Sequence, residues 1–507
     1  MQLRKRENLI ALLILLVGIF VRTYMFGSVP AGLNQDEAFA AYDAWSILNF
    51  GVDSAGKSYP VYLTAWGSGM NALESYLMIP LVAVFGMKIW AIRLPQLIIA
   101  ILSLIAMYGM TKRTLGKNCA LWILGICTIC PWHIMLSRWA LESNLAPGFL
   151  LFGTYFFIRG LENRKYLILS ALMYGLSLYC YATIWPIVPM MLLLQIIYCR
   201  KELRIDRYAV ISALILFALA LPLMLFLAVN YGWIEELSIG PVTIPKLVVM
   251  RASEFSIASM GENIANTAKI LWNQSDRIFW NSSNAFGILY MLSMPLCIIG
   301  IFAAAIKLCK KREKSCVEGI MLIWLAGALL LGALIHVNVN RINIIFFPLL
   351  FFTGYGANLA ATYFGSVGKI AIAAAYALMF TLFLGFYFGE FESLSHYYYQ
   401  DGIGSALEAA QEKSETVYLD ESIYHSQVLF YSQTDPYTYM DTVEYRYYPT
   451  TYLSAKSFAN FIFDIDASSL DENGSYIALQ SQDVESLRNA GFTLEKHGIY
   501  TLAYKEK

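Results

Sequence analysis

The stretch MQLRKRENLIALLILLVGIFVRTYMF, residues 1–26, decides the class of fold, because a basic start is followed by one long apolar run. The run is long for the apolar core of a secretory signal peptide, and no small-x-small cleavage site follows it. We therefore expect a retained signal-anchor helix whose N-terminus is cytoplasmic.

The composition extends this interpretation to the whole chain. Of the 507 residues, 58% are hydrophobic and only 14% are charged, which is typical of a polytopic membrane protein. The net charge is zero, so no basic excess points to nucleic acid as a partner. The 8 cysteines lie in or beside apolar segments, and no second CxxC pair occurs. This pattern predicts packing inside helices rather than disulfides or a metal site.

Apolar runs of spanning length predict eleven transmembrane helices. A further run, 71–86, contains Glu74 and Pro80 and is short, so we place it along or dipping into the outer surface. With this choice, the loops that carry most Lys and Arg fall on the cytoplasmic side, as the positive-inside rule requires. The expected spans are 7–27, 93–111, 119–136, 144–159, 166–182, 185–199, 208–229, 285–306, 317–336, 342–360 and 369–389.

Two outer loops and a polar C-terminal segment complete the expected architecture. The loops are residues 28–92 and 230–284. From residue 390 the composition becomes polar, and helix-like and strand-like runs alternate, which predicts a small α/β domain outside the cell. The sequence thus predicts an α-helical polytopic membrane domain, 1–389, followed by a soluble extracytoplasmic domain, 390–507.

The first outer loop contains the stretch GLNQDEAFAAYDAW, residues 32–45, with the adjacent carboxylates Asp36 and Glu37. A carboxylate at this surface can act as a general base toward a hydroxyl group or bind a divalent metal. The stretch also fits a helix start, because Asn34 and Asp36 are good N-cap residues, and spacing alone favours this second interpretation. Asp43, two turns further along the same face, would extend an acidic surface.

Three charged residues lie near predicted outer ends of later spans. Arg138 and Glu142 form either part of a functional site or an ordinary i,i+4 helix pair. Arg341 carries a guanidinium group, which suits a phosphate, but an arginine at this depth also snorkels to the membrane interface for purely structural reasons. Both interpretations of each residue stay open on sequence grounds.

Other polar residues of the outer side have less defined roles. Arg22 and Arg93 either pair with the acidic loop or a lipid phosphate, or snorkel. Lys57 and Tyr59 of the first loop are candidate substrate-binding residues. No P-loop, GxSxG, dinucleotide-binding or HExxH motif occurs, which argues against an ATP-powered enzyme and a zinc protease.

Short motifs succeed one another in a recognisable order along residues 1–390. The signal anchor is followed by NQDEA at the first outer loop, AIRLP at the next span, the basic turn TKRTLG, SRWALE at an outer boundary, and RINIIFFP late in the membrane part. This order resembles the GT-C glycosyltransferases, specifically the family 39-like group that includes the protein O-mannosyltransferases and the lipid A aminoarabinose transferase. The motifs are short, so their order carries much of the resemblance.

The resemblance implies a hexosyl- or pentosyltransferase of the plasma membrane. Its donor would be a polyprenyl-phosphate-linked sugar, and its acceptor a cell-envelope glycan, lipid or protein on the outer face. Asp36 would be the general base of an inverting displacement, and Glu37 would position acceptor or donor. Arg138 and Glu142, the latter where many members have Asp, would form a second site element, and Arg341 would bind the donor phosphate. A divalent metal at Asp36 and Glu37 is allowed but not required.

The alternative function is that of a polytopic transporter or lipid flippase. Such a protein is expected to show matching halves with helices broken near the membrane midplane. No matching halves are visible here, and the polar residues gather at one face. A third class is a non-catalytic assembly or sensor protein whose outer domain binds a partner.

Overall fold

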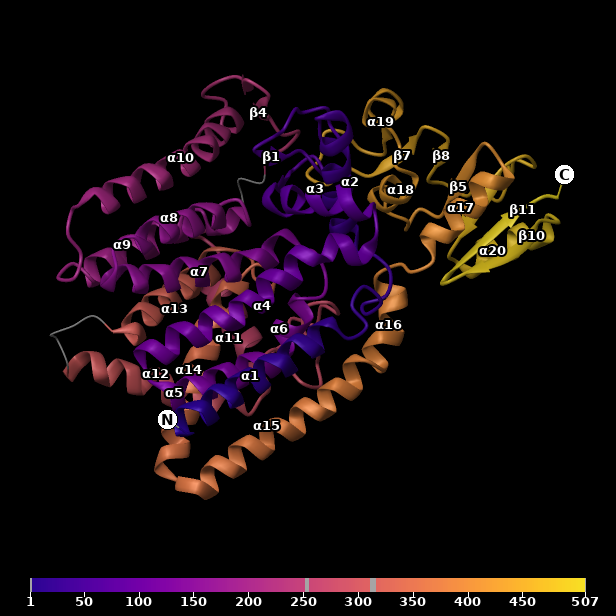
Figure 1. The fold of residues 1–507 in the computed structure, drawn as a ribbon. Helices are drawn as coiled ribbons and strands as arrows, with labels where there is room; N and C mark the ends of the chain where they lie inside the picture. The colour runs from indigo at the N-terminus through magenta and orange to yellow at the C-terminus, as the bar shows by residue number, and fades with distance from the viewer. Residues whose placement is uncertain (1, 251–254, 311–315, 507) are drawn as a thin grey trace. The chain divides into compact units, whose positions relative to one another are not determined.

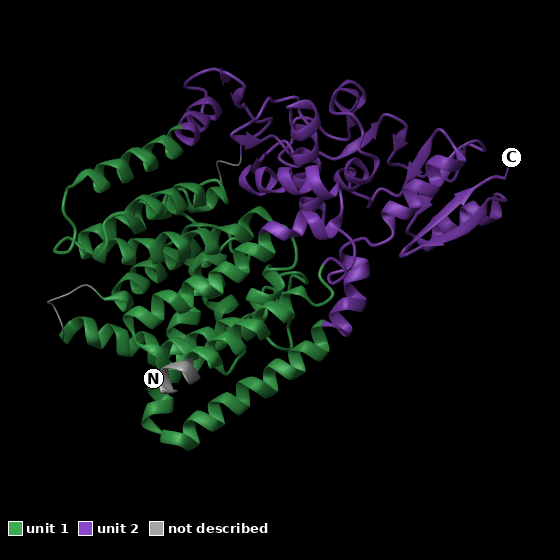
Figure 2. Cartoon of the chain, in the orientation of Figure 1, with its two compact units in different colours: residues 1–26, 96–221, 252–387 green, residues 27–95, 222–251, 388–507 purple. Residues whose placement is uncertain are grey.

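The structure of the chain is a computed structural model that describes residues 2–250, 255–310 and 316–506. It is predominantly helical (Figure 1). The chain divides into two compact units (Figure 2). Unit 1 comprises Met1–Phe26, Gln96–Leu221 and Ala252–Tyr387, and unit 2 comprises Gly27–Pro95, Pro222–Arg251 and Phe388–Lys507.

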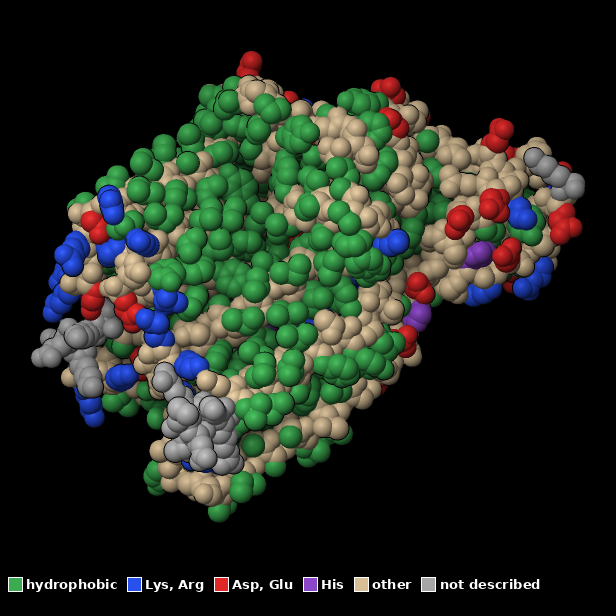
Figure 3. Space-filling view, in the orientation of Figure 1, with side chains coloured by type: hydrophobic (Ala, Val, Ile, Leu, Met, Phe, Trp, Pro, Cys, Tyr) green, Lys and Arg blue, Asp and Glu red, His purple; other side chains and the backbone are tan. Residues whose placement is uncertain are grey.

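Unit 1 is built from helices, and two further helices, α4 (Ile89–Thr114) and α10 (Arg207–Asn230), continue from it into unit 2. Figure 3 shows hydrophobic side chains over much of the helical surface, with Lys and Arg gathered near the ends of α8, α9 and α10. The helices of unit 1 are α1 (Gln2–Thr23), α5 (Lys117–Ile129), α6 (Pro131–Leu136), α7 (Glu142–Glu162), α8 (Tyr166–Ser177), η1 (Ala182–Ile184), α9 (Ile187–Tyr198), α11 (Met260–Asn273), α12 (Ser293–Lys310), α13 (Val317–Leu334), η3 (Asn343–Ile345), α14 (Phe346–Tyr363) and α15 (Gly365–Tyr387).

Glycines allow α12 and α14 to pack with their backbones in contact. A Cβ atom on Gly356 would lie 1.9 Å from the carbonyl oxygen of Leu296, and one on Gly300 would lie 2.0 Å from that of Phe352. Small residues at such crossings are typical of helices that associate within a membrane, where close packing replaces the hydrophobic effect.

Each of the eleven expected spans overlaps a helix of the structure. Within the described residues, 6 helices are long and apolar enough to cross a membrane, and the other apolar helices are shorter. The count of eleven spans therefore stays a prediction. The expected run 285–306 becomes helical only at Ser293, because Gly287 and Tyr290 adopt positive φ angles of 73° and 63°.

Unit 2 combines helices with a 7-stranded mixed sheet in the order β10-β11-β9-β5-β8-β7-β6. Strand β5 pairs in parallel with β8 and β9, and the other pairs are antiparallel. The elements of the unit are α2 (Gln35–Phe50), β1 (Tyr62–Leu63), β2 (Met70–Asn71), α3 (Leu73–Phe85), β3 (Leu237–Ile239), β4 (Val242–Ile244), α16 (Glu390–Tyr398), α17 (Ile403–Lys413), β5 (Val417–Leu419), α18 (His425–Ser432), α19 (Pro436–Thr442), β6 (Glu444–Tyr445), β7 (Ala455–Phe458), β8 (Phe461–Ile462), β9 (Ser475–Ala478), α20 (Ser481–Asn489), β10 (Thr493–His497) and β11 (Tyr500–Tyr504).

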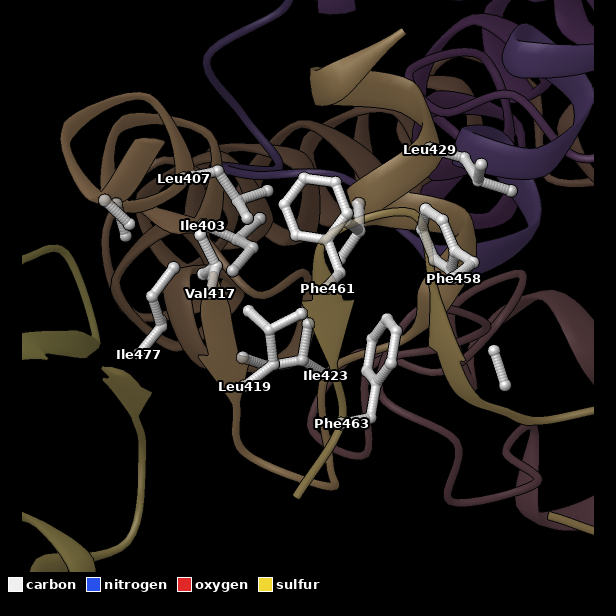
Figure 4. Packing of buried hydrophobic residues seen from close by; sticks show 14 of the residues in the cluster. Ile403, Leu407, Val417, Leu419, Ile423, Leu429, Phe458, Phe461, Phe463 and Ile477 are labelled. Atoms are coloured by element: carbon white, nitrogen blue, oxygen red, sulfur yellow. The ribbon is translucent and has the colours of Figure 1, made fainter. Parts of the chain in front are cut away.

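The core of unit 2 joins the first loop to the C-terminal segment. Side chains of α17, β5, β8 and β9 fill it (Figure 4), and Tyr42 of α2 belongs to the same buried cluster. The Tyr42 hydroxyl donates a hydrogen bond to the carbonyl oxygen of Thr434 at 2.6 Å. The alternation of helices and strands predicted after residue 390 is found, whereas the boundary at 389/390 and the extracytoplasmic location stay predictions.

Candidate active site

The two adjacent carboxylates lie in the first turn of α2, where a capping box begins the helix. The side chain of Asn34 accepts a hydrogen bond from the backbone N–H of Asp36 at 2.9 Å. The Glu37 carboxylate in turn accepts from the backbone N–H of Asn34 at 3.0 Å. The sequence motif NQDE is therefore a helix start, as its spacing indicated.

Glu37 is also half of a fully buried ion pair. Its two oxygens accept hydrogen bonds from Nε and Nη2 of Arg93 at 2.7 and 2.9 Å, and neither side chain is exposed to solvent. Arg93 donates further to the carbonyl oxygens of Pro30 and Gly32 at 2.8 and 2.9 Å. The bidentate geometry fixes the loop before α2 against the first turn of α4. Of the roles left open for Arg93, the structure selects pairing with the acidic loop.

The same loop is held by the C-terminal segment. The N–H of Leu33 donates to the carbonyl oxygen of Tyr399 at 2.6 Å, and the Gln427 side-chain amide donates to the carbonyl oxygen of Leu33 at 2.6 Å. Only glycine fits at position 32, where φ is +73° and a Cβ atom would lie 2.4 Å from the Tyr399 oxygen. These contacts tie the loop before α2 to the C-terminal segment.

Asp36 differs from its neighbour because it is partly exposed. It lies in the first turn of α2, where a negative charge interacts favourably with the helix dipole. Burial, and next the negative charge of Asp36, raises the pKa of Tyr424, which precedes α18. A partly exposed carboxylate at a helix start is suited to act as a general base.

Two buried carboxylates support the turn that follows α2. Asp43 accepts from the N–H of Ser54 at 2.8 Å, and both oxygens of Asp53 accept hydrogen bonds, from Ala55 and Lys57 on one side and from Thr64 on the other. Burial raises the pKa of both carboxyls, and the charge of Asp53 raises that of Asp43 further. The expectation that Asp43 extends an acidic surface is wrong, because its side chain is fully buried.

Lys57 and Tyr59, the other candidates of the first loop, follow that turn. The Lys57 ammonium lies 2.7 and 2.9 Å from the two carboxylate oxygens of Glu236, which comes from the second predicted outer loop. Lys57 lines a cavity of unit 2. Tyr59 has a φ of +37° and is 42% exposed.

Arg138 belongs to unit 1, where it holds the end of α1. Its Nη1 donates to the carbonyl oxygens of Val21 and Arg22 at 3.1 and 3.0 Å, and its Nη2 to those of Tyr24 and Met25 at 2.8 and 2.9 Å. These groups complete the hydrogen bonding of a helix C-terminus. Arg138 precedes α7, which begins at Glu142, so of the two alternatives left open by the sequence, an ordinary i,i+4 pair within one helix does not occur.

Glu142 and Arg341 come from neighbouring parts of unit 1. Glu142 lies in the first turn of α7, and Arg341 lies in the turn before η3, where its N–H donates to the Asn338 side chain at 2.8 Å. The Asn343 side chain donates to the carbonyl oxygen of Ser143 at 2.6 Å and ties the two segments together. Arg341 is partly exposed, which suits contact with a ligand.

Within residues 2–250, 255–310 and 316–506, no group of three or more His, Cys, Asp and Glu side chains is arranged to hold a metal ion. Sequence reasoning did not find Glu236 and His425, which line the cavity of unit 2. It also did not find Asp53, which accepts hydrogen bonds from the lining residues Ala55, Lys57 and Thr64. A weak signal for Asp53 was its place in VDSAGK, where an Asp beside small residues favours a turn. Glu236 and His425 have no local signal, because they reach this region only through the tertiary fold.

Comparison with known proteins supports the expected family resemblance. The sequence model of the family described as dolichyl-phosphate-mannose-protein mannosyltransferase matches residues 72–226. No curated protein sequence matches the chain significantly.

Solved structures with the same fold extend over almost the whole chain. ArnT from Cupriavidus metallidurans bound to undecaprenyl phosphate is similar with a TM-score of 0.60 at 12% identity, over 98% of this chain and 99% of that chain. The apo form gives a TM-score of 0.57 at 11% identity, over 99% of each chain. The Archaeoglobus fulgidus oligosaccharyltransferase tethered with an acceptor peptide gives 0.51 at 13% identity, over 85% of this chain and 63% of that chain. These matches show an ArnT-like fold. Together with the family match over residues 72–226, they confirm the predicted resemblance to GT-C glycosyltransferases.

Proposed function

We propose that this protein is a membrane glycosyltransferase that moves a sugar from a polyprenyl-phosphate donor to a hydroxyl group of an acceptor on the outer face of the plasma membrane. The family match and the fold support a glycosyltransferase that uses a lipid-linked donor. The N-terminus is then cytoplasmic, and unit 2 works on the outer side.

One observation carries the assignment of the base. Asp36 is partly exposed, while its neighbour Glu37 is fully buried and fixed by Arg93. The two carboxylates therefore have different roles. Glu37 holds the helix start, and Asp36 is accessible to a substrate. Glu37 is a positioning residue in this proposal, and it acts through Asp36 rather than by touching a substrate.

The reaction is a single displacement. Asp36 accepts the proton of the acceptor hydroxyl, and the oxygen forms a bond to the anomeric carbon. The bond from that carbon to the phosphate oxygen breaks, the electron pair leaves with the polyprenyl phosphate, and the anomeric configuration inverts. The guanidinium group of Arg341 is suited to the charge of the phosphate. Arg138 contributes by holding the end of α1, and Glu142 begins α7 beside the Arg341 turn.

The test compares cells that lack the protein and are complemented with wild type, Asp36→Asn or Asp464→Asn. Asp464 is an exposed carboxylate of the same unit, and its substitution is the matched control. Mass spectrometry of envelope glycans, glycolipids and proteins should reveal one sugar modification that wild type and Asp464→Asn restore. Loss of a general base lowers the rate by about 10²–10⁴-fold, so Asp36→Asn should not restore it. If Asp36→Asn restores the sugar modification fully at the same protein level as wild type, the assignment of Asp36 as the general base is refuted.

A further inference from the structure

Unit 2 contains a cavity of about 540 Å³ whose wall includes several aromatic side chains. It begins at Phe39, one helical turn after Asp36 on α2. Its remaining wall comes from three separate parts of the chain, namely the first loop, the 236–248 segment and the C-terminal segment. The aromatic lining side chains are Phe39, Trp66, His425, Tyr439, Tyr445 and Tyr448.

Trp66 of this wall is held by three ring contacts. Its ring stacks on Tyr452 with centroids 4.7 Å apart and planes 7° apart, and it meets Phe39 and His425 edge-on at 4.8 and 5.2 Å. The residue adopts a φ of +59°, a conformation that is strained for a side chain of this size. Backbone strain of this kind is concentrated at ligand-binding sites.

The indole N–H of Trp66 is buried, and it has no hydrogen-bond partner within the part of the chain that the structure describes. Buried polar groups are nearly always paired, so an orphaned donor indicates a missing acceptor. The side chain lines the cavity, and a hydroxyl or carbonyl oxygen of a bound molecule would supply that acceptor.

Polar groups accompany the aromatic wall. The ion pair of Lys57 and Glu236, about one third exposed, lines the cavity together with the exposed Lys246. Thr64 and Ser54 also contribute to the lining. The cavity therefore offers flat aromatic faces beside both donors and acceptors, and an alkyl chain would leave these charged groups facing hydrocarbon.

We infer that this cavity binds a sugar ring of a saccharide acceptor. A pyranose presents weakly polarised C–H bonds on its faces, which stack on electron-rich aromatic rings, and hydroxyl groups at its edge, which match Lys57, Glu236 and the Trp66 N–H. The inference rests on the proposed transferase function and narrows its acceptor to a glycan or glycolipid. Phe39, which lines the cavity, lies one helical turn after the proposed base Asp36.

The experiment measures binding by saturation-transfer NMR on the full chain in nanodiscs, without any donor. The probes are cellotetraose, chitotetraose and tetragalacturonate, and a soluble Ser/Thr hexapeptide serves as the competing class. At least one saccharide should bind to wild type. Tyr448→Ala should weaken this binding about tenfold, because it removes an exposed aromatic face from the lining. Tyr447→Ala is the matched control, since Tyr447 is 79% exposed and does not line the cavity.

Trp66→Phe is the second variant, because it keeps a ring and removes only the N–H donor. It should also weaken saccharide binding, and its circular dichroism spectrum reports whether the fold is kept. Binding of no saccharide, binding of the peptide alone, or equal losses in the Tyr447 and Tyr448 variants would each overturn the inference. If saccharides bind here but the complementation test shows no sugar transfer, the transferase function is refuted and the saccharide site is kept. If that test shows transfer to a peptide or an unglycosylated lipid, the transferase function is kept and the saccharide acceptor is refuted.

Discussion

The two carboxylate oxygens of Glu37 lie 2.7 and 2.9 Å from the Nε and Nη2 atoms of Arg93, and water reaches neither side chain. The pair connects the first turn of α2 to the first turn of α4. Because Asp36 precedes Glu37 directly, the position of the proposed base depends on an arginine from a distant part of the sequence.

Substitution of Glu37 by Gln should destabilise the protein severely. Arg93 would keep its charge in a site without solvent, and removal of one partner of a buried pair typically costs about 3–5 kcal/mol. Thermal unfolding in detergent should show this loss. Glu421→Gln is the control, because Glu421 is 62% exposed in its pair with Arg446, and such pairs contribute about 0–1 kcal/mol. A melting temperature equal to wild type in Glu37→Gln would contradict a structural role for the pair.

Much of the membrane part could be predicted from the sequence, because a spanning helix is a local property of about 20 apolar residues. The start of α2 was also predictable, since its cap lies within three residues. The run 285–292 shows the limit, because its residues are apolar while the positive φ of Gly287 and Tyr290 keeps it from being helical.

The candidate site was less predictable, because its contacts join distant segments. The sequence showed that Asp36 and Glu37 are chemically alike but not that one is buried and the other accessible. That difference arises because Arg93 pairs with Glu37. The cavity of unit 2 is lined by residues such as Trp66 and His425, which lie far apart in the sequence and share no recognisable spacing. The same holds for Arg138, whose four carbonyl partners lie at the end of α1.

Substitution of Arg138 by Lys should lower stability rather than substrate affinity. A lysine ammonium cannot reach the four carbonyl oxygens that the guanidinium group now satisfies, so buried acceptors lose partners at a cost of about 2–4 kcal/mol. The melting temperature should fall, while KM of the folded fraction stays unchanged. Arg341→Lys is the control for stability, because Arg341 is partly exposed. A raised KM with an unchanged melting temperature in Arg138→Lys would instead favour direct contact with substrate.

Asp43 and Asp53 should respond in opposite ways to substitution by Asn. One oxygen of Asp43 has no hydrogen-bond partner within the described residues, and burial raises its pKa. Because the pKa of Asp43 is raised in the native protein, wild type loses stability as the pH rises above the ordinary pKa of an aspartic acid. The stability of Asp43→Asn should therefore match or exceed that of wild type at pH 7, and this advantage should disappear near pH 4. Asp53→Asn should cost about 2–4 kcal/mol, because both oxygens of Asp53 accept hydrogen bonds. Urea unfolding at both pH values measures the difference, and equal effects of the two substitutions would contradict it.

His425 lies among aromatic side chains, with ring centroids of Phe39 and Trp66 at 5.5 and 5.2 Å. Burial lowers the pKa of its imidazole to about 3. Between this value and the ordinary pKa of about 6.5, the unfolded chain binds a proton that the native protein does not. Stability must therefore fall as the pH drops below about 6.5, by up to about 1.4 kcal/mol per pH unit.

The variant His425→Gln lacks this titration, so its stability relative to wild type should rise steadily from pH 7 to pH 4. His396→Gln is the control of opposite sign. Burial opposes the charge of His396, but hydrogen bonds to Asp401 and Glu392 at 2.7 and 3.2 Å raise its pKa overall. The stabilisation that the charged His396 provides is present below its ordinary pKa and is lost as the pH rises. His396→Gln should therefore lower the stability of the protein more at pH 5.5 than at pH 8.5. Melting temperatures across this range test both signs, and parallel curves for His425→Gln and wild type would show that His425 titrates in the native protein as it does in the unfolded chain.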